Sequence, residues 1–546
     1  MNNPFQSVID QPIVNDKTIK DLLTYNGTCY WWFIDHLLYQ YINTKTHLIH
    51  NKSLFLIVNI VCRYFKPLFL IYDILASFLW SIITKIYCKN CCDNNKKLPG
   101  VFLYRMDMSE WRTVFGSLIN LYHNDIAERL TKSVIVKSVY EIPIGQELLL
   151  RTLRKYMKIQ KQGKHFTANS LPIITYWSKN VWNGEIKAFA HFGDVFTIID
   201  HNPVWYDEWN KITGLNAEDI RMEFKIYLQY VLPILIRNQI LYNNMFQAEK
   251  PMGIAMRDEQ TPSGRGIVLM AKLNGVPTIG IQHGGIAKHA SYLYHETQSD
   301  RLLNNRCPIP DVTLVWGKSE HDLLINNNYP HDGVVITGNP RYDVLNYANT
   351  KYSRDRYCKS HGIDINKKII LWATQSHGWD LELNHQYLHE IFSTITEIDD
   401  VVLIIKQHPN EKGIHDRLIQ ESIDKYNTSV IIHPDKSSDS TELVFISDIL
   451  IIESSTLGQE GVVFHKPIIV MDFSKKPDYA EYVKEGVAIG VFKQGTLKNT
   501  IVDILNNNFN FKIYQDKYII NHMGVVDGNS SQKCANVILS VCDFNT

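Results

Sequence analysis

The spacing of apolar positions along the chain changes at about residue 98. Beyond it, short β-rich runs alternate with stretches whose apolar side chains recur at helical spacing. MGIAMRD at 252–258 predicts a strand, residues 263–275 predict a helix capped by Ser263, and VPTIGIQHGG predicts another strand. This order predicts a βαβ unit and therefore a parallel sheet. Upstream, we expect strands at 101–105 and 133–139 and a long helix at 216–248 capped by Asn216.

Seven further apolar runs follow: VTLVWG, GVVITGNP, KKIILWATQ, VVLIIKQHP, SVIIHP, DILIIESS and KPIIVMD. Continuous runs of Val, Ile and Leu are typical of strands that are buried on both faces of a parallel sheet. We therefore predict an α/β protein with two Rossmann-type, doubly wound parallel-sheet domains that face a cleft. The expected boundaries are 98–300 for the first domain, 298–310 for the hinge, 311–520 for the second domain, and 521–546 for a helix that crosses back.

Residues 53–88 form the most apolar stretch, but charged side chains such as Arg63 and Asp73 interrupt it. A spanning helix needs about 20 nearly uncharged residues. The aromatic run at 30–33 precedes the stretch and is typical of a membrane interface. We expect residues 1–97 to be a helical, membrane-associated region that holds the protein at the cytoplasmic face of the cell membrane. A buried helical hairpin and a true double span are the alternatives.

Charge and cysteine usage restrict the function further. The 56 basic and 56 acidic side chains give a formal net charge of zero, and no basic block indicates a nucleic-acid partner. Any anionic ligand is therefore held by a local site, which favours a small phosphorylated substrate. The nine cysteines are scattered, and Cys88, Cys91 and Cys92 have no second pair at zinc-ligand spacing. The polar N-terminus lacks the pattern of a secretory signal, so we expect an intracellular protein.

Ligands of open parallel sheets bind at the carboxyl ends of the strands. Five of the predicted strands end in polar residues that include glycine, histidine or hydroxyl side chains. We therefore expect the binding site among these ends, which are Gln282–Gly285, Thr337–Arg341, Thr374–His377, His408–Asn410 and Glu453–Thr456.

Two histidines are the candidate catalytic residues. His283 lies between a predicted strand and a glycine turn, where an imidazole can act as an acid or base or bind phosphate. His408 precedes a proline and lies two residues after Lys406, so the pair could offer positive charge to a diphosphate. The alternative for each histidine is a structural hydrogen bond to a nearby loop.

Ser454, Ser455 and Thr456 precede a predicted helix, where hydroxyls and free backbone N–H groups form an anion site. Glu460 follows one turn later, and its carboxylate could accept hydrogen bonds from two ribose hydroxyls. The alternatives are ordinary helix capping by the hydroxyls and a favourable dipole interaction for the glutamate.

The remaining candidates have weaker patterns. Gly338, Asn339 and Arg341 could bind the donor or could form a structural turn. His377, in the loop after a predicted strand, is a further donor-side candidate. Asp107 and Glu110 are acceptor-side candidates. Neither an Asp-x-Asp motif at a strand end nor a GxxxxGK[ST] loop is present, so we expect no metal and no cofactor, only a nucleotide-activated donor substrate.

From about 252 to 505, the chain resembles a superfamily that includes UDP-N-acetylglucosamine 2-epimerases, CDP-glycerol glycerophosphotransferases and capsule-polysaccharide glycosyltransferases. The resemblance rests on IQHGG, VWG, TGNPRYD, KQHPN, SDILIIESSTLGQE and KPIIVMD in this order. It implies a GT-B-like fold in which residues 454–456 bind the nucleotide diphosphate, Glu460 its ribose, and His408 the phosphate or the transferred group. The epimerases have H-x-E-A-G where this chain reads HGGI from His283, which argues against epimerase activity.

The sequence therefore predicts a GT-B-type, metal-independent glycosyltransferase of surface-polysaccharide biosynthesis. It would move a sugar from a nucleotide donor to a lipid-linked or glycan acceptor near the membrane surface. A CDP-glycerol-type polyol-phosphate transferase is the main alternative. An epimerase and a non-catalytic scaffold of the same fold are the others.

Overall fold

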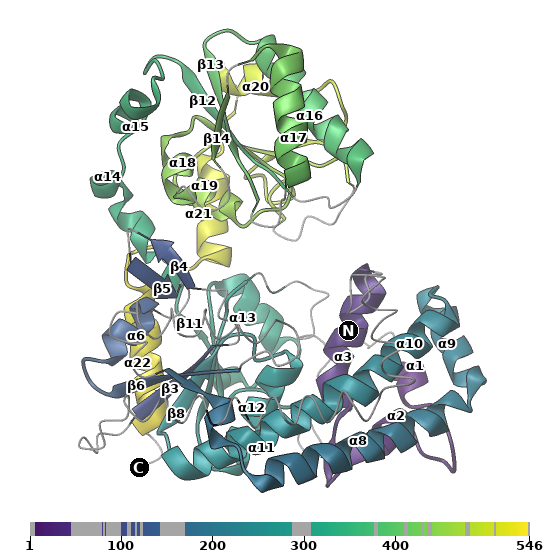
Figure 1. Ribbon diagram of the computed structural model, residues 1–546. Coiled ribbons are helices and arrows are strands. Elements are labelled where there is room, and N and C mark those ends of the chain that lie inside the picture. The colour runs from purple at the N-terminus through teal and green to yellow at the C-terminus, as the bar shows by residue number, and fades with distance from the viewer. Residues whose placement is uncertain are drawn as a thin grey trace. The chain divides into compact units, whose positions relative to one another are not determined.

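The computed structural model describes residues 6–44, 79, 82, 100–105, 111–114, 117–120, 124–141, 170–284, 286, 307–375, 380–408, 413–428, 430–433, 439–474, 481–506 and 509–543. The chain divides into two compact units, each with helices beside a parallel sheet (Figure 1). Unit 1 comprises residues 1–315, 320–335 and 532–546, and unit 2 comprises residues 316–319 and 336–531.

Unit 1 contains a seven-stranded sheet in the order β11-β10-β9-β8-β3-β6-β7. The predicted βαβ unit is confirmed: β8 (Gly253–Met256) pairs in parallel with β9 (Thr278–Ile281), and α12 (Pro262–Leu273) connects them. The cap of α12 is Thr261, which accepts a hydrogen bond from Gly264 N, and not the predicted Ser263. The other strands are β3 (Gly100–Arg105), β6 (Ile135–Tyr140), β7 (Ser170–Pro172), β10 (Val312–Val315) and β11 (Val334–Ile336).

Two of the seven predicted strands belong to a different sheet than expected. The runs VTLVWG and GVVITGNP form β10 and β11, which we assigned to the second domain. β10 instead pairs in parallel with β9, with Leu314 opposite Ile281, and so extends the sheet of unit 1. An apolar run shows that a strand is buried on both faces, but it does not show which neighbour the strand has.

Unit 2 contains a six-stranded sheet in the order β14-β13-β12-β15-β16-β17. The five remaining predicted runs form its strands, which confirms an α/β fold with parallel sheets. The sequence analysis missed the short edge strand β17 (Ile489–Val491). The others are β12 (Lys368–Ala373), β13 (Val401–Lys406), β14 (Val430–His433), β15 (Ile449–Ile452) and β16 (Ile468–Met471).

Helices cover both faces of the sheet in unit 2. Along β12, Ile369 and Leu371 enter one core, and Ile370 and Trp372 enter the other. This alternation explains why the strands read as continuous apolar runs. One face carries α16 (Leu381–Thr396), α17 (Gly413–Tyr426) and α20 (Leu497–Leu505), and the other carries α18 (Ser440–Ile446), α19 (Leu457–Val463) and α21 (Lys512–His522).

The predicted long helix is confirmed in unit 1, with Asn216 accepting a hydrogen bond from Glu218 N at its start. A π-helical turn at Tyr227–Val231 joins α10 (Ala217–Ile226) to α11 (Leu232–Glu249). The preceding helices are α8 (Lys179–Asp200) and α9 (Pro203–Thr213).

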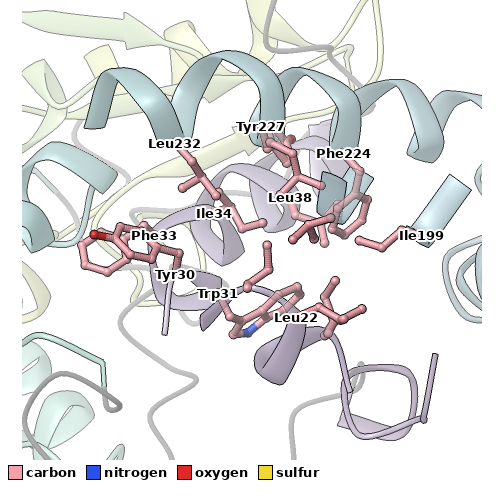
Figure 2. Close-up of a cluster of buried hydrophobic side chains, with 14 of the residues drawn as sticks. Leu22, Tyr30, Trp31, Phe33, Ile34, Leu38, Ile199, Phe224, Tyr227 and Leu232 are labelled. Atoms are coloured by element: carbon pink, nitrogen blue, oxygen red, sulfur yellow. The ribbon is translucent and has the colours of Figure 1, made fainter. Parts of the chain in front are cut away.

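The aromatic run at 30–33 is buried and does not form a membrane-interface group, which corrects our prediction. Tyr30, Trp31, Trp32 and Phe33 are 1–5% exposed and belong to one apolar cluster with α8, α9, α10 and α11. Figure 2 shows other side chains of this segment, Ile34 and Leu38 among them, directed toward the long helix. The segment consists of α1 (Gln6–Ile9), α2 (Ile19–Leu22), β1 (Thr24–Tyr25), β2 (Thr28–Cys29) and α3 (Trp31–Thr44).

A buried ion pair joins this segment to the βαβ unit. Arg265 of α12 is 1% exposed and donates to the carboxylate of Asp35 and to the carbonyl oxygen of Trp32. Burial opposes the charge of Arg265, but the nearby negative charge of Asp35 contributes to a net rise in its pKa. The guanidinium therefore remains charged inside the unit and fixes α3 against α12.

The C-terminal helix α22 (Ser530–Asp543) returns to unit 1. Cys534, Ala535, Ile538 and Cys542 are buried there with Ala255 of β8 and Ile279 of β9. Within the described residues, no helix is both long and apolar enough to cross a bilayer. The apolar stretch at 53–88 lies outside the described residues, apart from Leu79 and Ile82.

The buried aromatic cluster predicts that Trp31→Ala will lower the free energy of unfolding of unit 1 by about 3–5 kcal/mol. The change removes a buried indole, 3% exposed, and leaves a cavity. Urea unfolding followed by circular dichroism measures the loss. The matched control is Trp182→Ala on α8, where the indole is 42% exposed and the loss should stay below 1 kcal/mol. Equal losses in both variants would contradict the proposed packing.

Candidate functional site

In unit 1, the carboxyl ends of β8 and β9 bring a histidine and an aspartate together. Nε2 of His283 lies 2.6 Å from Oδ1 of Asp258, and Oδ2 of Asp258 lies 2.9 Å from Nε of Arg257. Asp258 is 8% exposed, whereas the side chain of His283 is 27% exposed. The carboxylate therefore holds the imidazole on one side while the ring keeps contact with solvent.

The loop after β8 is wound tightly enough to fix Asp258. The backbone of Asp258 is left-handed, with φ of 59°. The carbonyl oxygen of Asp258 accepts a hydrogen bond from the hydroxyl of Thr261 at 2.7 Å. A Cβ on Gly264 would lie 2.3 Å from that carbonyl oxygen, so only glycine fits the first turn of α12. His283 was predicted from its place at a strand end, but Asp258 was not, because an acidic residue after a strand is usually solvated.

An imidazole that donates through Nε2 to a carboxylate carries its basic lone pair on Nδ1. The adjacent negative charge also stabilises the imidazolium that forms when the ring accepts a proton. His283 and Asp258 therefore pair a candidate base with the carboxylate that orients it, and Nδ1 of His283 is buried in this structure.

In unit 2, Thr374 ties the end of β12 to the end of β13. Thr374 N donates to the carbonyl oxygen of Lys406 at 3.0 Å, and its hydroxyl accepts from His408 N at 3.0 Å. These bonds fix the backbone of His408 at the carboxyl edge of the sheet. Lys406 is 7% exposed, and its Nζ donates to the carbonyl oxygen of Gln407 at 3.1 Å.

The hydroxyl residues after β15 have different environments. Ser455 Oγ accepts from Leu457 N, the first residue of α19, at 3.2 Å, and the carbonyl oxygen of Ser455 accepts from the Tyr482 hydroxyl at 3.0 Å; the N-cap position itself is Thr456. Ser454 is half-buried and Thr456 is exposed. The capping alternative therefore describes Ser455, while phosphate binding by Ser454 and Thr456 stays a prediction.

Arg341 and Glu460, both predicted on the donor side, form an ion pair. Arg341 Nη2 donates to Glu460 Oε1 at 3.1 Å, and Glu460 is 1% exposed. Burial raises the pKa of Glu460, and the charge of Arg341 only partly offsets this rise. The carboxylate has a protein partner in this structure, so ribose binding by Glu460 stays a prediction.

Gly338 and Asn339 form a structural turn. Gly338 has a φ of 80°, and a Cβ there would lie 2.6 Å from Ser530 Oγ. Asn339 Oδ1 accepts from Arg341 N at 3.1 Å and so caps the following 3-10 helix, Pro340–Tyr347. Asp343 of that helix accepts from the backbone N–H groups of Ser530 and Ser531, both at 2.8 Å.

Three predicted site residues, His377, Asp107 and Glu110, lie outside the described residues. Among the residues that the structure does describe, no group of three or more His, Cys, Asp or Glu side chains is arranged as a metal site.

A cavity that the sequence analysis missed lies under α16 and α17, at the carboxyl edge of the unit 2 sheet. Its volume is about 30 Å³. Its polar lining includes Thr374 after β12, Glu453 after β15, Tyr387 of α16 and His415 of α17. Thr374 and Glu453 had a sequence signal, since both belong to the predicted strand ends. Tyr387 and His415 had no such signal, because their place in the cavity lining depends on which face of each helix packs against the sheet.

The fold is that of a Rossmann-type α/β protein with candidate binding residues at the ends of its strands. A sequence model of the family described as CDP-Glycerol:Poly(glycerophosphate) glycerophosphotransferase matches residues 254–540. The match covers more than half of the 546 residues, so the chain belongs to this family. This finding confirms the resemblance that the strand-end motifs indicated. It supports a transferase with a nucleotide-linked donor, within which sugar and polyol-phosphate transfer are the two alternatives.

One similar solved structure supports the fold. The UDP-GlcNAc 2-epimerase from Neisseria meningitidis bound to UDP-GlcNAc has a TM-score of 0.51 and 13% identity, covering 81% of this chain and all of that one. The corresponding epimerase from Methanocaldococcus jannaschii has a TM-score of 0.47 and 13% identity, with 81% and 99% coverage. The glycotransferase of kitacinnamycin has a TM-score of 0.44 and 9% identity, with 82% and 100% coverage. Only the first exceeds 0.5, and it shows a GT-B-like fold alone. A search of curated protein sequences found no match.

The pair of Arg341 and Glu460 predicts a pH-dependent loss of stability in Arg341→Met. The pKa of Glu460 is raised in the folded state. As the pH rises above the pKa that Glu460 has in the unfolded chain, ionisation of its carboxyl group therefore lowers the free energy of unfolding. Without Arg341, that cost grows. We expect a loss of about 1–2 kcal/mol at pH 8 and a smaller loss at pH 5, measured by urea unfolding.

Two variants control this experiment. Adding Glu460→Gln to Arg341→Met should remove most of the pH dependence. Arg417→Met, which removes an exposed i,i+4 partner of Glu421, should change stability by less than about 0.5 kcal/mol at both pH values. A loss in Arg341→Met that is larger at pH 5 would refute the assignment.

Proposed function

We propose that this protein transfers a polyol phosphate from a CDP-activated donor to a hydroxyl group of a surface-polymer acceptor. Membership in the glycerophosphotransferase family supports this choice over the sugar transfer that we first predicted from the sequence. Among the structural observations, the 2.6 Å contact between His283 and Asp258 carries the proposal, because it provides an oriented base for an acceptor hydroxyl.

In the proposed reaction, the oxygen of the acceptor hydroxyl attacks the donor phosphorus that carries the polyol. The hydroxyl proton passes to His283 as the new P–O bond forms. The bridging P–O bond of the diphosphate breaks, and its electron pair leaves with CMP. Asp258 stabilises the imidazolium that results, and solvent removes the proton afterwards.

Unit 2 would bind the donor. His408 and Lys406, at the end of β13, would supply positive charge to the diphosphate, and Ser454 and Thr456 would supply hydroxyl donors. We further propose that no resident metal is needed, because these groups would balance the charge of the leaving CMP. The apolar stretch at 53–88 supports work at the cytoplasmic face of the membrane on a lipid-linked or glycan acceptor.

The product separates the two transferase alternatives. Polyol-phosphate transfer releases a nucleoside monophosphate, whereas transfer of a sugar alone releases a nucleoside diphosphate. We expect the full-length protein, incubated with CDP-glycerol and a poly(glycerol phosphate) acceptor, to release CMP, measured by anion-exchange chromatography. Release of UDP from a UDP-sugar without CMP release from CDP-glycerol would establish the sugar-transfer alternative.

His283→Gln should lower kcat for CMP release by about 10²–10³-fold, because the acceptor loses its base. Asp258→Asn should lower kcat by a smaller factor, because the imidazole remains and only the carboxylate that orients it is lost. The matched control is His331→Gln, which changes an imidazole that is 80% exposed. Unchanged kcat in His283→Gln would exclude the proposed base.

The proposed metal independence predicts that EDTA will leave CMP release within about twofold of the untreated rate. The reaction is followed after dialysis against the chelator and again after Mg²⁺ is restored. A loss of activity that Mg²⁺ reverses would show that a cation, and not protein groups alone, balances the leaving-group charge.

A further inference from the structure

The cavity under α16 and α17 contains a buried histidine with unused hydrogen-bonding capacity. His415 is 7% exposed, and neither of its ring nitrogens has a hydrogen-bond partner among the residues that the structure describes. A buried imidazole without partners loses the hydrogen bonds that water would supply, which is unfavourable. Both nitrogens belong to a residue that lines the cavity, so a ligand in the cavity can restore those bonds.

The position of His415 is fixed by its neighbours. Asp416, the next residue, accepts from Gln407 Nε2 at 2.6 Å, which ties the first turn of α17 to the end of β13. Leu418 and Ile419 of the same helix are buried in the core of this face. His415 therefore faces the cavity because the helix is held at both its polar and its apolar contacts.

The rest of the polar lining selects the charge of the ligand. Glu453 accepts from the hydroxyl of Ser474 at 2.9 Å, and its side chain also hydrogen-bonds to Tyr387. Tyr387 accepts in turn from Phe473 N at 2.9 Å. These contacts hold a buried carboxylate, 5% exposed, in the wall of the cavity. Its negative charge disfavours a phosphate and favours a neutral group that can donate a hydrogen bond.

The volume restricts the ligand further. A buried water molecule needs roughly 10–15 Å³ of such space, so about 30 Å³ admits about two groups of that size. A hydroxyl on a short carbon chain fits this volume, whereas an intact sugar ring is larger. A neutral imidazole presents one donor and one acceptor nitrogen, which matches a hydroxyl that both accepts and donates.

We propose that this cavity receives a hydroxyl-bearing end of the polyol in the donor and that His415 hydrogen-bonds to it. The proposal rests on the proposed function, because the donor is taken to be a CDP-polyol. The cavity adjoins the predicted donor site in sequence and in space: Glu453 directly precedes Ser454, and Thr374 binds the backbone of His408. The phosphates would stay with the hydroxyl and cationic residues, while the neutral end enters beside the carboxylate.

The test compares CDP-glycerol with a CDP-linked propanol that lacks the free hydroxyls, using the full-length protein. His415→Leu should raise KM for CDP-glycerol by about tenfold, because both ring nitrogens are lost. It should leave the Kd for CDP unchanged, since CDP carries no polyol. His415→Gln keeps a donor and an acceptor and should restore KM to within about threefold of the wild-type value.

The propanol donor makes the test specific. Removing the hydroxyls from the donor should raise KM of the wild-type protein by about tenfold and should cause no further rise in His415→Leu. The matched control is His389→Leu, which changes an exposed histidine of α16. This variant should leave KM unchanged both for CDP-glycerol and for the CDP-linked propanol.

Other outcomes overturn the proposal. If removing the donor hydroxyls and replacing His415 by Leu raise KM additively, the polyol hydroxyls and the His415 imidazole do not contact each other. An unchanged KM with a lower melting temperature in His415→Leu would show that the cavity holds only solvent. If the wild-type protein neither binds CDP nor releases CMP, the proposed function itself fails, and that failure is visible without any variant.

Discussion

A buried guanidinium cannot remain in a protein interior without a counter-charge, and Arg265 imposes this requirement on unit 1. Asp35 and the carbonyl oxygen of Trp32 meet it, so the N-terminal segment is bonded to the helix of the βαβ unit. That helix starts directly after the loop that holds Asp258, and the strand that follows it, β9, ends two residues before His283. The ion pair of Arg265 with Asp35 thus links the buried aromatic cluster to the helix next to the loop that positions His283.

The strands could be predicted because their physical cause is local. A run of Val, Ile and Leu is buried on both faces wherever it occurs, and all seven runs of the second half are strands. Their distribution between two sheets depends on pairing across long stretches of chain, which no local pattern records. For this reason β10 and β11 were placed in the wrong sheet. The edge strand β17, with only three residues, was too short to stand out.

The aromatic run at 30–33 shows the limit of composition as a guide. Clustered Trp, Tyr and Phe side chains suit a membrane interface and a protein core equally well, and the difference lies in what covers them. Here the covering surface comes from α8 to α11, more than 140 residues later in the chain. The hydroxyl of Tyr30 also has a hydrogen-bond partner within the protein interior, because it donates to Gln239 Oε1 at 2.7 Å. The site shows the same division: strand ends revealed His283 and His408, while Asp258 and His415 depended on loop and helix geometry.

The return of α22 to unit 1 has a consequence for biosynthesis. Unit 2 is almost entirely one continuous stretch, 336–531, whereas in unit 1 the later helix α22 covers β8 and β9. A ribosome therefore delivers all of unit 2 before it delivers the last helix of unit 1. During that interval the apolar side chains of Ala255 and Ile279 lack their final cover. The nascent chain must keep this surface from aggregating until α22 has been synthesised, so unit 1 is completed only after unit 2 has left the ribosome.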